Sequence, residues 1–479
     1  MDAFGVGIFS QLAQMRAQRV SQGLPVVDLS VGAPNIAPAP HIMQALSREA
    51  LVPENYLYAL GDTQALREAV AAWYLRRYGV TLDPASEIVS LLGSQEGLAH
   101  IALSIVDPGD VVLVPDPCYP IFADGPRLAG ASLYPMPQRA ENGYLIDLDE
   151  IPPSVAQKAK LMVVSYPNNP TAVLAPDGFY HKLIAFAAKY DIIVLHDNAY
   201  SELVFDGASC GSFLAYPGAK EVGVEFNSLS KTYGLAGARC GFCVGCRAVV
   251  ERLSVLKSNL DYGMFLPIQK AAIAAITGDQ SCVEATRQAY QQRRDVLVEG
   301  LNALGWPVQK PQATMFVWAK LPHGFADDRK FVQDLLRESG LLVTPGSAFG
   351  ALGKGHVRMA LVQDNGAVQG ALETPPNAAP SDARLQVSTL EGELPHPSYT
   401  WNLITEWRKR HTSESPMFIL GGEDFMHLDT WHRGLELPNI TNFVVVPRCQ
   451  ADEETFRATI GRHWPKAVIT EPDENNLLS

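Results

Sequence analysis

The sequence predicts an α/β fold with a mainly parallel sheet, and three observations support this prediction. Short apolar runs such as Leu161–Ser165 and Ile192–Asp197 have the length and composition of buried strands. Polar turns or helix-like stretches follow these runs, which is typical of parallel strands joined by crossover helices. The chain has 479 residues, of which 47% are apolar, so it exceeds a single domain and can bury large cores.

Two strand-and-turn elements come first along the chain. The run VSLLGSQEGLAHIAL is a predicted strand, then Gly93 and Ser94, then a helix whose first amide groups can bind an anion. The next run, VVLVPDPCYPIF, places Tyr119 after a turn that contains prolines. The Tyr119 ring is suited to cover a flat ligand, although ordinary core packing is an alternative.

Polar side chains follow the next two predicted strands. Leu161–Ser165 leads into a turn with Asn169, and a later strand finishes in Asp197, with Tyr200 close behind. Ligands of open α/β sheets collect at the carboxyl ends of parallel strands, so these side chains are candidates for a binding site. For Asp197 the alternative is a capping role at the start of a following helix.

The run SLSKTYGLAGAR carries the strongest chemical signal. Lys231 lies there, with Ser228 and Ser230 before it and Arg239 after it. A lysine that forms a Schiff base with an aldehyde and then moves protons needs burial and neighbouring charge to lower its pKa. Serine hydroxyls and an arginine guanidinium suit a phosphate dianion. The run therefore indicates a pyridoxal phosphate attachment site, unless Lys231 is simply a solvated loop residue.

Three further side chains fit such a cofactor and its substrate. The Asp197 carboxylate can keep the pyridinium nitrogen protonated, which makes the ring an electron sink. Tyr200 would hydrogen-bond the phenolic oxygen of the cofactor. Arg358 lies in the apolar strand of GKGHVRMALV. A buried arginine needs an anionic partner, and a substrate carboxylate held by two hydrogen bonds is the natural one.

Together these motifs resemble the fold-type I pyridoxal-phosphate aminotransferases over roughly residues 5–372, and most closely the LL-diaminopimelate aminotransferases of bacteria. The matching stretches are VDLSVGAPNIAPAPHI, EIVSLLGSQEGLAHI, DVVLVPDPCYPIF, MVVSYPNNPTAV, HDNAYSELVFDG, EVGVEFNSLSKTYGLAG and LLVTPGSAFG. The resemblance implies a mainly parallel seven-stranded sheet flanked by helices, with a smaller α/β domain. The implied parts are an amino-terminal arm with part of the small domain (1–45), the large cofactor domain (46–265) and the small domain (266–372).

The resemblance also implies a role for each candidate residue. Lys231 and Asp197 would be catalytic. The cofactor ring would contact Tyr119, Asn169, Asp197 and Tyr200, and its phosphate would contact Ser228, Ser230, Arg239 and the amides of Ser94 and Gln95. The substrate carboxylate would contact Gly32, Asn169 and Arg358. Such enzymes are usually homodimers in which a tyrosine from the other subunit, here Tyr58, reaches the phosphate.

The sequence departs from the family pattern in two places. Both Tyr56 and Tyr58 are candidates for the phosphate-binding tyrosine, because neither aligns in perfect register with the family pattern. Ala238 and Cys240 flank Arg239, where the family usually has a tryptophan and an aliphatic residue. The second departure changes the packing near the phosphate without removing a charged contact.

Composition argues against several other classes. The net charge of -13 disfavours nucleic acid as a partner. The sequence has no apolar run of membrane-spanning length and no signal-peptide core, so we expect a cytoplasmic enzyme. Seven cysteines in so long a chain do not form a disulfide framework. Cys240, Cys243 and Cys246 follow one another in steps of three along a predicted strand, which puts successive thiols on opposite faces and favours packing over a metal site.

The composition of the chain changes near residue 373. The proline-rich run TPPNAAPSDA predicts a linker over residues 373–383. Beyond it, alternating elements predict part of a second α/β unit over residues 384–479. These elements are a strand at 384–387, a helix at 399–410, the strand MFILGG, a short helix containing Trp431 and the strand NFVVVPR.

This tail resembles the carboxyl half of the bacterial nicotinate-nucleotide adenylyltransferases. The matching stretches are PHPSYTWNLITEWRKR, FILGGEDFMHLDTWHRGLEL and NFVVVPR. The resemblance implies that Asp424, Trp431 and His432 recognise a nicotinate group. The paired histidines and the closing loop that bind phosphate in those enzymes are missing, so adenylyl transfer would lack electrostatic stabilisation. We expect a truncated remnant or a docking module rather than a second working enzyme.

The whole pattern predicts a pyridoxal-phosphate-dependent aminotransferase with amino-acid and 2-oxo-acid substrates. By resemblance, the exchange joins LL-diaminopimelate and 2-oxoglutarate, or glutamate and tetrahydrodipicolinate in the biosynthetic direction of the lysine pathway. An alanine or aromatic aminotransferase is the alternative within this class. A non-catalytic scaffold that binds a nicotinate nucleotide through its tail is the alternative outside it, and the joint presence of Lys231, Asp197 and Arg358 argues against that scaffold.

Overall fold

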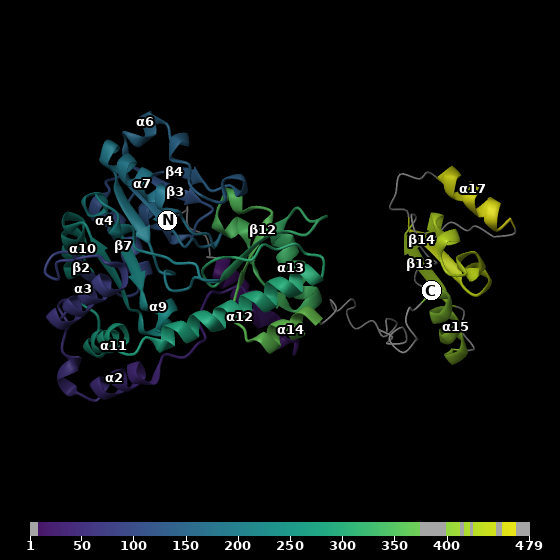
Figure 1. The fold of residues 1–479 in the computed structure, drawn as a ribbon, viewed down its shortest axis with the longest axis horizontal. Helices are drawn as coiled ribbons and strands as arrows, with labels where there is room; N and C mark the ends of the chain where they lie inside the picture. The colour runs from purple at the N-terminus through teal and green to yellow at the C-terminus, as the bar shows by residue number, and fades with distance from the viewer. Residues whose placement is uncertain (1–7, 374–398, 412–415, 422–424, 447–452, 466–479) are drawn as a thin grey trace. The chain divides into compact units, whose positions relative to one another are not determined.

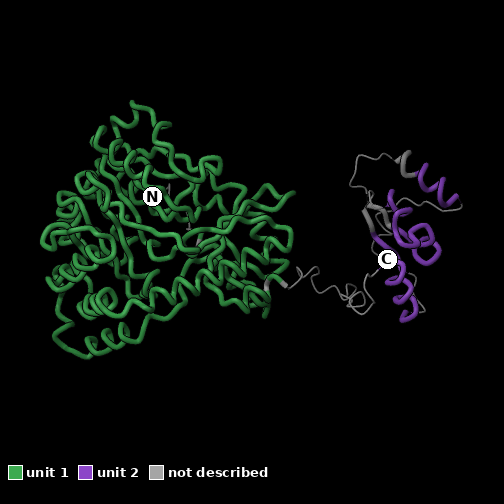
Figure 2. The backbone as a smooth tube through the Cα atoms, in the orientation of Figure 1, with its two compact units in different colours: residues 1–378 green, residues 379–479 purple. Residues whose placement is uncertain are grey.

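The chain forms two compact units, residues 1–378 and residues 379–479, drawn in different colours in Figure 2. The computed structural model describes residues 8–373, 399–411, 416–421, 425–446 and 453–465. The predicted linker after residue 373, the predicted strand at 384–387 and Asp424 lie outside these residues. The domain boundaries expected from the sequence stay predictions.

A seven-stranded sheet forms the centre of the first unit (Figure 1). Its strands are β2 (Ile88–Leu91), β3 (Val111–Asp116), β4 (Ser132–Pro137), β5 (Ala159–Ser165), β6 (Ile193–Asp197), β7 (Gly223–Ser228) and β8 (Gly241–Gly245). Their order across the sheet is β2-β8-β7-β6-β5-β3-β4. β8 runs antiparallel to both of its neighbours, whereas the pairs from β7 to β4 are parallel. This sheet confirms the predicted mainly parallel α/β fold.

Helices cover both faces of the sheet. The helices α2 (Pro40–Ala50), α3 (Gln64–Tyr78), α7 (Asp177–Tyr190) and α11 (Leu266–Thr277) share one core, and α4 (Ser94–Ile105), α5 (Ile121–Leu128) and α10 (Arg247–Leu260) share the other. Strand residues alternate between the two cores, so Met162 packs in the first and Val163 in the second. Cys240 and Cys243 also fall in different cores, and their thiols therefore do not converge.

The ends of α3 follow from local sequence. The Thr63 hydroxyl accepts a hydrogen bond from the amide of Leu66 at 3.3 Å, which caps the helix start. Gly79 ends the helix at a φ of 68°, a left-handed conformation that glycine adopts without a steric penalty. Val70 and Tyr74, one turn apart, are fully buried and face the sheet core. These signals place Tyr78 in the last turn of the helix.

A smaller α/β region completes the first unit. β1 (Val27–Asp28) pairs in parallel with β10 (Leu341–Leu342), and β11 (Thr344–Pro345), β12 (His356–Ala360) and β9 (Phe316–Lys320) form an antiparallel sheet. Its longer helices are α1 (Ile8–Ser21), α12 (Ser281–Ala303), α13 (Asp328–Ser339) and α14 (Asn365–Glu373), and the short helices α6 (Pro153–Ala156), α8 (Ala219–Val222) and α9 (Leu229–Thr232) belong to the larger region. Leu12 and Leu29 share a core with Leu297 and Phe331, so the amino-terminal residues pack against a distant part of the sequence.

The second unit contains a small α/β arrangement. Its described elements are α15 (Thr400–Arg410), β13 (Met417–Gly421), β14 (Asn442–Val446) and α17 (Glu453–His463), and the two strands pair in parallel. Its buried hydrophobic cluster contains Ile404, Phe425, Leu428 and Leu437. The predicted helix at 399–410 corresponds to α15, and the described parts of the predicted strands MFILGG and NFVVVPR correspond to β13 and β14.

The short helix expected around Trp431 is wrong. Two 3-10 turns, Leu428–Thr430 and Gly434–Asn439, lie on either side of Trp431 instead. Arg433 has a φ of 54°, and Pro438 lacks the amide that a continuing α-helix needs. Throughout the described parts of both units, no helix has the length and the apolar composition that crossing a membrane requires.

Candidate active site

Lys231 lies at the carboxyl edge of the large sheet, in the short helix α9. The Ser228 hydroxyl caps this helix by accepting a hydrogen bond from the amide of Ser230 at 3.2 Å. The Lys231 ammonium group donates to the carbonyl oxygen of Gly32 at 2.8 Å. The lysine therefore meets a backbone group 199 residues away in sequence, from the small α/β region.

Two effects make the Lys231 amine easier to deprotonate. Burial lowers its pKa to about 8, and the nearby guanidinium groups of Arg358 and Arg239 act in the same direction. The carboxylate of Asp197 opposes them. A neutral amine, which is the nucleophilic form, is thus accessible near neutral pH.

Asp197 ends β6 and is buried beside this lysine. Burial raises its pKa to about 6, against the opposing effects of His196, the amide of Ala199 and Lys231. Its carboxylate accepts a hydrogen bond from the Ala199 amide at 3.3 Å. Turn residues follow rather than a helix, so the alternative role as a helix cap is wrong.

Tyr200 follows in the same turn, with its side chain buried. Its ring lies with its centroid 6.0 Å from the Lys231 nitrogen and packs edge-on against Phe316, with ring centroids 5.7 Å apart. Burial raises the pKa of Tyr200, so its hydroxyl keeps its proton and can donate a hydrogen bond.

Arg358 points from β12 into the same region and is only 1% exposed. Its guanidinium donates to the Asn169 side-chain oxygen at 3.0 Å and to the Ser30 carbonyl at 2.9 Å. The rings of Phe316 and Phe349 lie 4.1 and 4.7 Å from it. Burial lowers the pKa of Arg358 to about 10, so it stays cationic at neutral pH. These contacts orient a buried cation, and the oxygens of Asn169 and Ser30 that accept its hydrogen bonds are both neutral.

A second cationic position lies at the start of α4. The N-cap residue is Gly93, which has no side chain to bond the first amides of the helix, beginning with that of Ser94. A Cβ atom built on Gly93 would overlap the guanidinium of Arg239, which places that guanidinium against the helix start. Arg239 itself has a φ of 56°, a left-handed conformation that costs energy for a residue with a side chain. The arrangement fits an anion such as a phosphate group.

Tyr119 is tied to the same helix start. Its hydroxyl donates to the side-chain oxygen of Gln95 at 2.9 Å, and its ring packs edge-on against Phe122. Burial raises the pKa of its hydroxyl, and the nearby guanidinium groups of Arg358 and Arg239 oppose this shift, whereas the Asp197 carboxylate adds to it. Its packing against Phe122 and its place beside these charges are compatible with both roles expected for it.

The structure brings most of the predicted residues together, with one exception. Tyr58 is 88% exposed, and its described ring contact is with Tyr262, 6.5 Å away. The reasoning from sequence missed Phe316, Phe349 and the carbonyl of Ser30, which surround the Arg358 guanidinium. Phenylalanines in apolar strands look like core residues and a backbone carbonyl has no side-chain signature, so no sequence signal marked them.

Comparison with known proteins gives this constellation a family. The model of the family described as aminotransferase class I and II matches residues 25–373. The chain belongs to the class I and II aminotransferases. An LL-diaminopimelate aminotransferase of Moorella thermoacetica is 46% identical over 367 residues, which cover 76% of this chain and 94% of that protein.

Solved structures of related proteins have the same fold as the first unit. The substrate-bound structure of BacF from Bacillus subtilis has a TM-score of 0.74 and 38% identity, and covers 76% of this chain and 92% of its own. A probable N-succinyldiaminopimelate aminotransferase from Thermus thermophilus has a TM-score of 0.73 and 35% identity, and covers 77% of this chain and 98% of its own. Residues after 373 lie outside the family match.

Class I and II aminotransferases use pyridoxal phosphate, and the residues of this site fit that group. A lysine with a lowered pKa suits the aldehyde, and a buried carboxylate suits the ring nitrogen. The uncapped start of α4 with Arg239 above it suits the phosphate. Each chemical feature of the cofactor thus has a group of matching chemistry among the described residues of the first unit.

Proposed function

We propose that this protein is an LL-diaminopimelate aminotransferase that uses pyridoxal phosphate and 2-oxoglutarate. The observation that carries the proposal is the identity of 41 to 46% with several proteins named LL-diaminopimelate aminotransferase, over about three quarters of this chain. The arrangement of Lys231, Asp197 and Arg358 supports the chemistry. In the biosynthetic direction, glutamate would donate its amino group to tetrahydrodipicolinate.

The roles at the reacting atoms follow from position and charge. When bound, pyridoxal phosphate supplies an aldehyde that exchanges amines and a ring that withdraws electrons from the substrate α-carbon. The neutral Lys231 amine would remove the proton from that carbon and, as the ammonium group, would return it to the cofactor carbon that carries the aldehyde. Asp197, as a carboxylate, would pair with the ring nitrogen, and the Tyr200 hydroxyl would donate to the phenolic oxygen.

The remaining residues hold the two anionic ends. Arg358 binds the substrate α-carboxylate through its fork, with Asn169 orienting the guanidinium and Gly32 lining the site. A side chain at Gly32 would overlap the ring of Phe316, because a Cβ there would lie 2.6 Å from two of its carbons. The phosphate group would be held by Arg239, Ser228, Ser230 and the amides of Ser94 and Gln95.

The half-reaction with a panel of amino acids tests the substrate. The purified full chain is mixed with each amino acid, and the change in cofactor absorbance gives the rate of amino transfer. We expect LL-diaminopimelate and glutamate to react at least tenfold faster than alanine or phenylalanine. Faster reaction with alanine or an aromatic amino acid would support the aminotransferase activity but contradict LL-diaminopimelate as the substrate.

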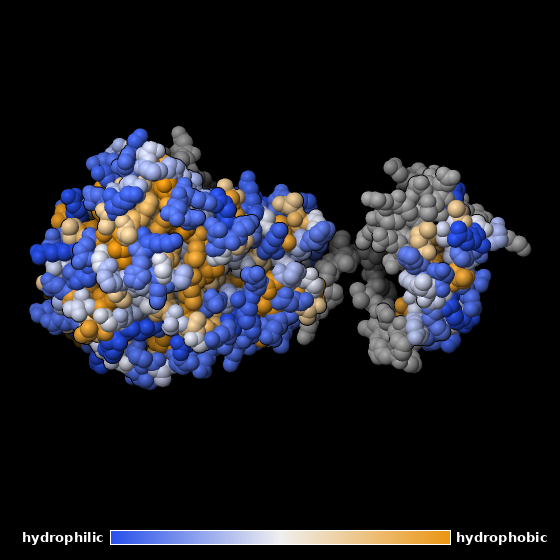
Figure 3. Space-filling model, turned by 45° about the horizontal axis from the view of Figure 1, so that its top comes forward, coloured by the Kyte–Doolittle hydropathy of each residue, from blue (hydrophilic) through white to orange (hydrophobic). Residues whose placement is uncertain are grey.

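We also propose that the first unit forms a homodimer. Exposed apolar residues from two segments gather on its surface, namely Leu51, Tyr56, Leu57, Tyr58, Leu60, Val255, Leu260, Tyr262 and Phe265. The segments touch, since the rings of Tyr56 and Phe265 lie 5.2 Å apart and the Gly263 amide donates to the Ala59 carbonyl at 2.7 Å. Figure 3 shows one face of the first unit, on which hydrophobic residues are visible among hydrophilic ones. A large exposed apolar patch supports a protein interface, which would present Tyr58 to the partner's site.

Sedimentation of one matched pair of variants tests the dimer. Leu57→Asp puts a charge in the patch and is expected to shift the protein to monomers. Leu304→Asp, at an exposed leucine outside the patch, serves as the control and is expected to leave the dimer intact. A wild-type protein that sediments as a monomer would overturn the dimer proposal.

For the second unit we propose a non-catalytic module related to nucleotidyltransferases. The parallel pair β13 and β14 supports an α/β origin, and the His432 ring stacks on Tyr399 with centroids 4.4 Å apart. Calorimetry of the full chain with nicotinate mononucleotide tests it for ligand binding, and incubation with that nucleotide and ATP tests it for adenylyl transfer. Formation of the dinucleotide would contradict the proposal.

A further inference from the structure

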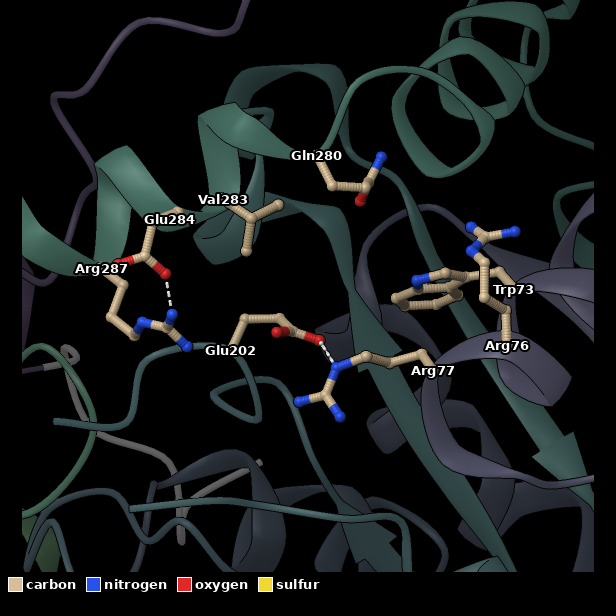
Figure 4. A pocket seen from close by; sticks show the side chains of 8 residues that line it. All are labelled: Trp73, Arg76, Arg77, Glu202, Gln280, Val283, Glu284 and Arg287. Atoms are coloured by element: carbon tan, nitrogen blue, oxygen red, sulfur yellow. Dashed lines mark hydrogen bonds and ion pairs between the residues drawn. The ribbon is translucent and has the colours of Figure 1, made fainter. Parts of the chain in front are cut away.

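The last two residues of α3 contact the segment that follows Tyr200. The Arg77 guanidinium donates to the Glu202 carboxylate at 2.6 Å and to the Cys210 carbonyl at 3.2 Å. Figure 4 shows this ion pair on the wall of a surface pocket, with Trp73 and Arg76 from the same helix. The ion pair therefore holds Glu202 from the solvent side.

Tyr78, the next residue, contacts the same segment from the buried side. Its hydroxyl lies 2.8 Å from the Ser201 hydroxyl and accepts a hydrogen bond from the Asn227 side-chain nitrogen at 3.3 Å. The Asn227 oxygen in turn accepts the amide hydrogen of Ser228 at 2.8 Å. The Tyr78 hydroxyl thus connects the residue after Tyr200 with the residue before Ser228.

The two connected segments hold opposite ends of the proposed cofactor. Tyr200 lies after β6 and would contact the phenolic oxygen. Ser228 ends β7, caps α9 and leads directly to Lys231, next to the phosphate position. β6 and β7 are adjacent, parallel strands, so both segments continue from the same edge of the sheet. The Tyr78 hydroxyl links the two segments through its contacts with Ser201 and Asn227.

The Tyr78 hydroxyl and its partners Ser201 and Asn227 are buried, so loss of their hydrogen bonds would cost free energy of folding. Ser201 and Asn227 are each 1% exposed, and Tyr78 is 9% exposed. Burial raises the pKa of Tyr78 well above its ordinary value, so the hydroxyl keeps its proton. A buried polar group left without its partner costs about 1 to 3 kcal/mol in proteins generally. Loss of the hydroxyl would therefore favour a shift of Ser201 or Asn227 toward new partners.

We propose that Tyr78 is a positioning residue that sets Tyr200 and Ser228 at the separation the cofactor requires. The proposal rests on the proposed cofactor-dependent function. This role differs from ordinary core stabilisation because it affects two contacts with the cofactor. One is the contact of Tyr200 with the phenolic oxygen, and the other is the contact of Ser228 with the phosphate. A purely structural Tyr78 would change the stability of the fold and leave those contacts as they are.

Tyr78→Phe removes the hydroxyl and keeps the ring. We expect the affinity for pyridoxal phosphate to fall about tenfold, the change in binding that loss of one buried hydrogen bond of about 1.4 kcal/mol produces. We also expect the pH at which the bound cofactor changes absorbance to shift in the same direction as in Tyr200→Phe, by a smaller amount. Titration of absorbance against pH and of apoprotein fluorescence against cofactor measures both quantities.

The double variant Tyr78→Phe with Tyr200→Phe tests whether Tyr78 changes the absorbance midpoint through the Tyr200 hydroxyl. If Tyr78 acts through Tyr200, its effect on the absorbance midpoint disappears once the Tyr200 hydroxyl is gone. If Tyr78→Phe moved the absorbance midpoint by the same amount with and without the Tyr200 hydroxyl, the proposal would be overturned.

Tyr74→Phe is the matched control on the same helix. The Tyr74 hydroxyl is buried like that of Tyr78, and it contacts Glu225 of β7 at 3.1 Å and the Asn227 side chain. The contact with Ser201, next to Tyr200, belongs to Tyr78. Both variants are expected to lower the thermal stability of the apoprotein, but only Tyr78→Phe is expected to move the absorbance midpoint. Equal shifts of this midpoint in both variants, or a shift in neither, would contradict the positioning role. A wild-type protein that binds no cofactor would contradict the proposed function instead.

Discussion

The two units differ in how they use buried polar groups. In the first unit, Lys231, Asp197 and Arg358 are charged side chains held in or near a large core, and their pKa values are shifted by burial. In the second unit, the buried hydrophobic cluster is small, and the described ion pairs, such as Arg433 with Glu436, lie at its surface. Shifted pKa values cluster at functional sites. The comparison therefore places the chemistry in the first unit.

The largest expected effect comes from Lys231→Ala. This change removes the amine that we propose moves protons at the substrate carbon, and we expect amino transfer to fall by about 10⁴-fold. Single-turnover rates with LL-diaminopimelate measure it. Lys182→Ala, at an exposed lysine of α7, is the control with an expected change below about twofold. Comparable activity in Lys231→Ala and wild type would remove the basis for placing the chemistry in the first unit.

Asp197→Asn should separate activity from stability. Without a carboxylate at the ring nitrogen, we expect kcat to fall about 10³-fold. In the apoprotein the same change should be stabilising at pH 7, by about 1 to 3 kcal/mol, because it removes a buried charge.

The pH dependence of that stabilisation follows from the pKa of Asp197. Burial raises this pKa from 3.8 to about 6 in the folded protein. Between these values the folded state binds more protons than the unfolded state, so wild-type stability falls as pH rises from about 4 to 6. Denaturant unfolding of both apoproteins should therefore show no difference at pH 4 and the full difference above pH 6. An equal difference at both pH values would mean that Asp197 is not buried as a destabilised charge.

Arg358→Lys keeps the charge and removes the fork. We expect kcat/KM to fall about 10- to 100-fold, mainly through KM, because an ammonium group cannot hold the substrate carboxylate and Asn169 in the same geometry. Steady-state kinetics with LL-diaminopimelate measures this split. Arg252→Lys, on the exposed side of α10, is expected to change neither parameter. A kcat effect with unchanged KM would mean that Arg358 does not bind the substrate.

The sequence predicted the positions of candidate side chains well where these side chains end parallel strands. Asp197 closes β6 and Asn169 follows β5, and adjacent parallel strands bring such positions to one edge without knowledge of the loops. The contacts of Arg358 with Ser30 and Phe349 were not predictable, because they depend on how separate segments of the small region fold together. Ser30 follows β1, and Phe349 ends a 3-10 turn before β12. The short helix around Trp431 failed because the left-handed backbone of Arg433 interrupts it. Tyr58 stays a prediction, since its role requires a second copy of the chain.

The smallest expected effect is in the second unit, at Trp431. Trp431 belongs to the apolar cluster of that unit, and we expect Trp431→Ala in the full chain to change kcat/KM for amino transfer by less than about twofold. The same variant should weaken any binding of nicotinate mononucleotide, because an aromatic face is lost. Steady-state kinetics and calorimetry on one preparation measure both. A tenfold loss of amino transfer with an unchanged melting temperature would mean that the second unit contributes to the reaction. The chemistry could then no longer be assigned to the first unit alone.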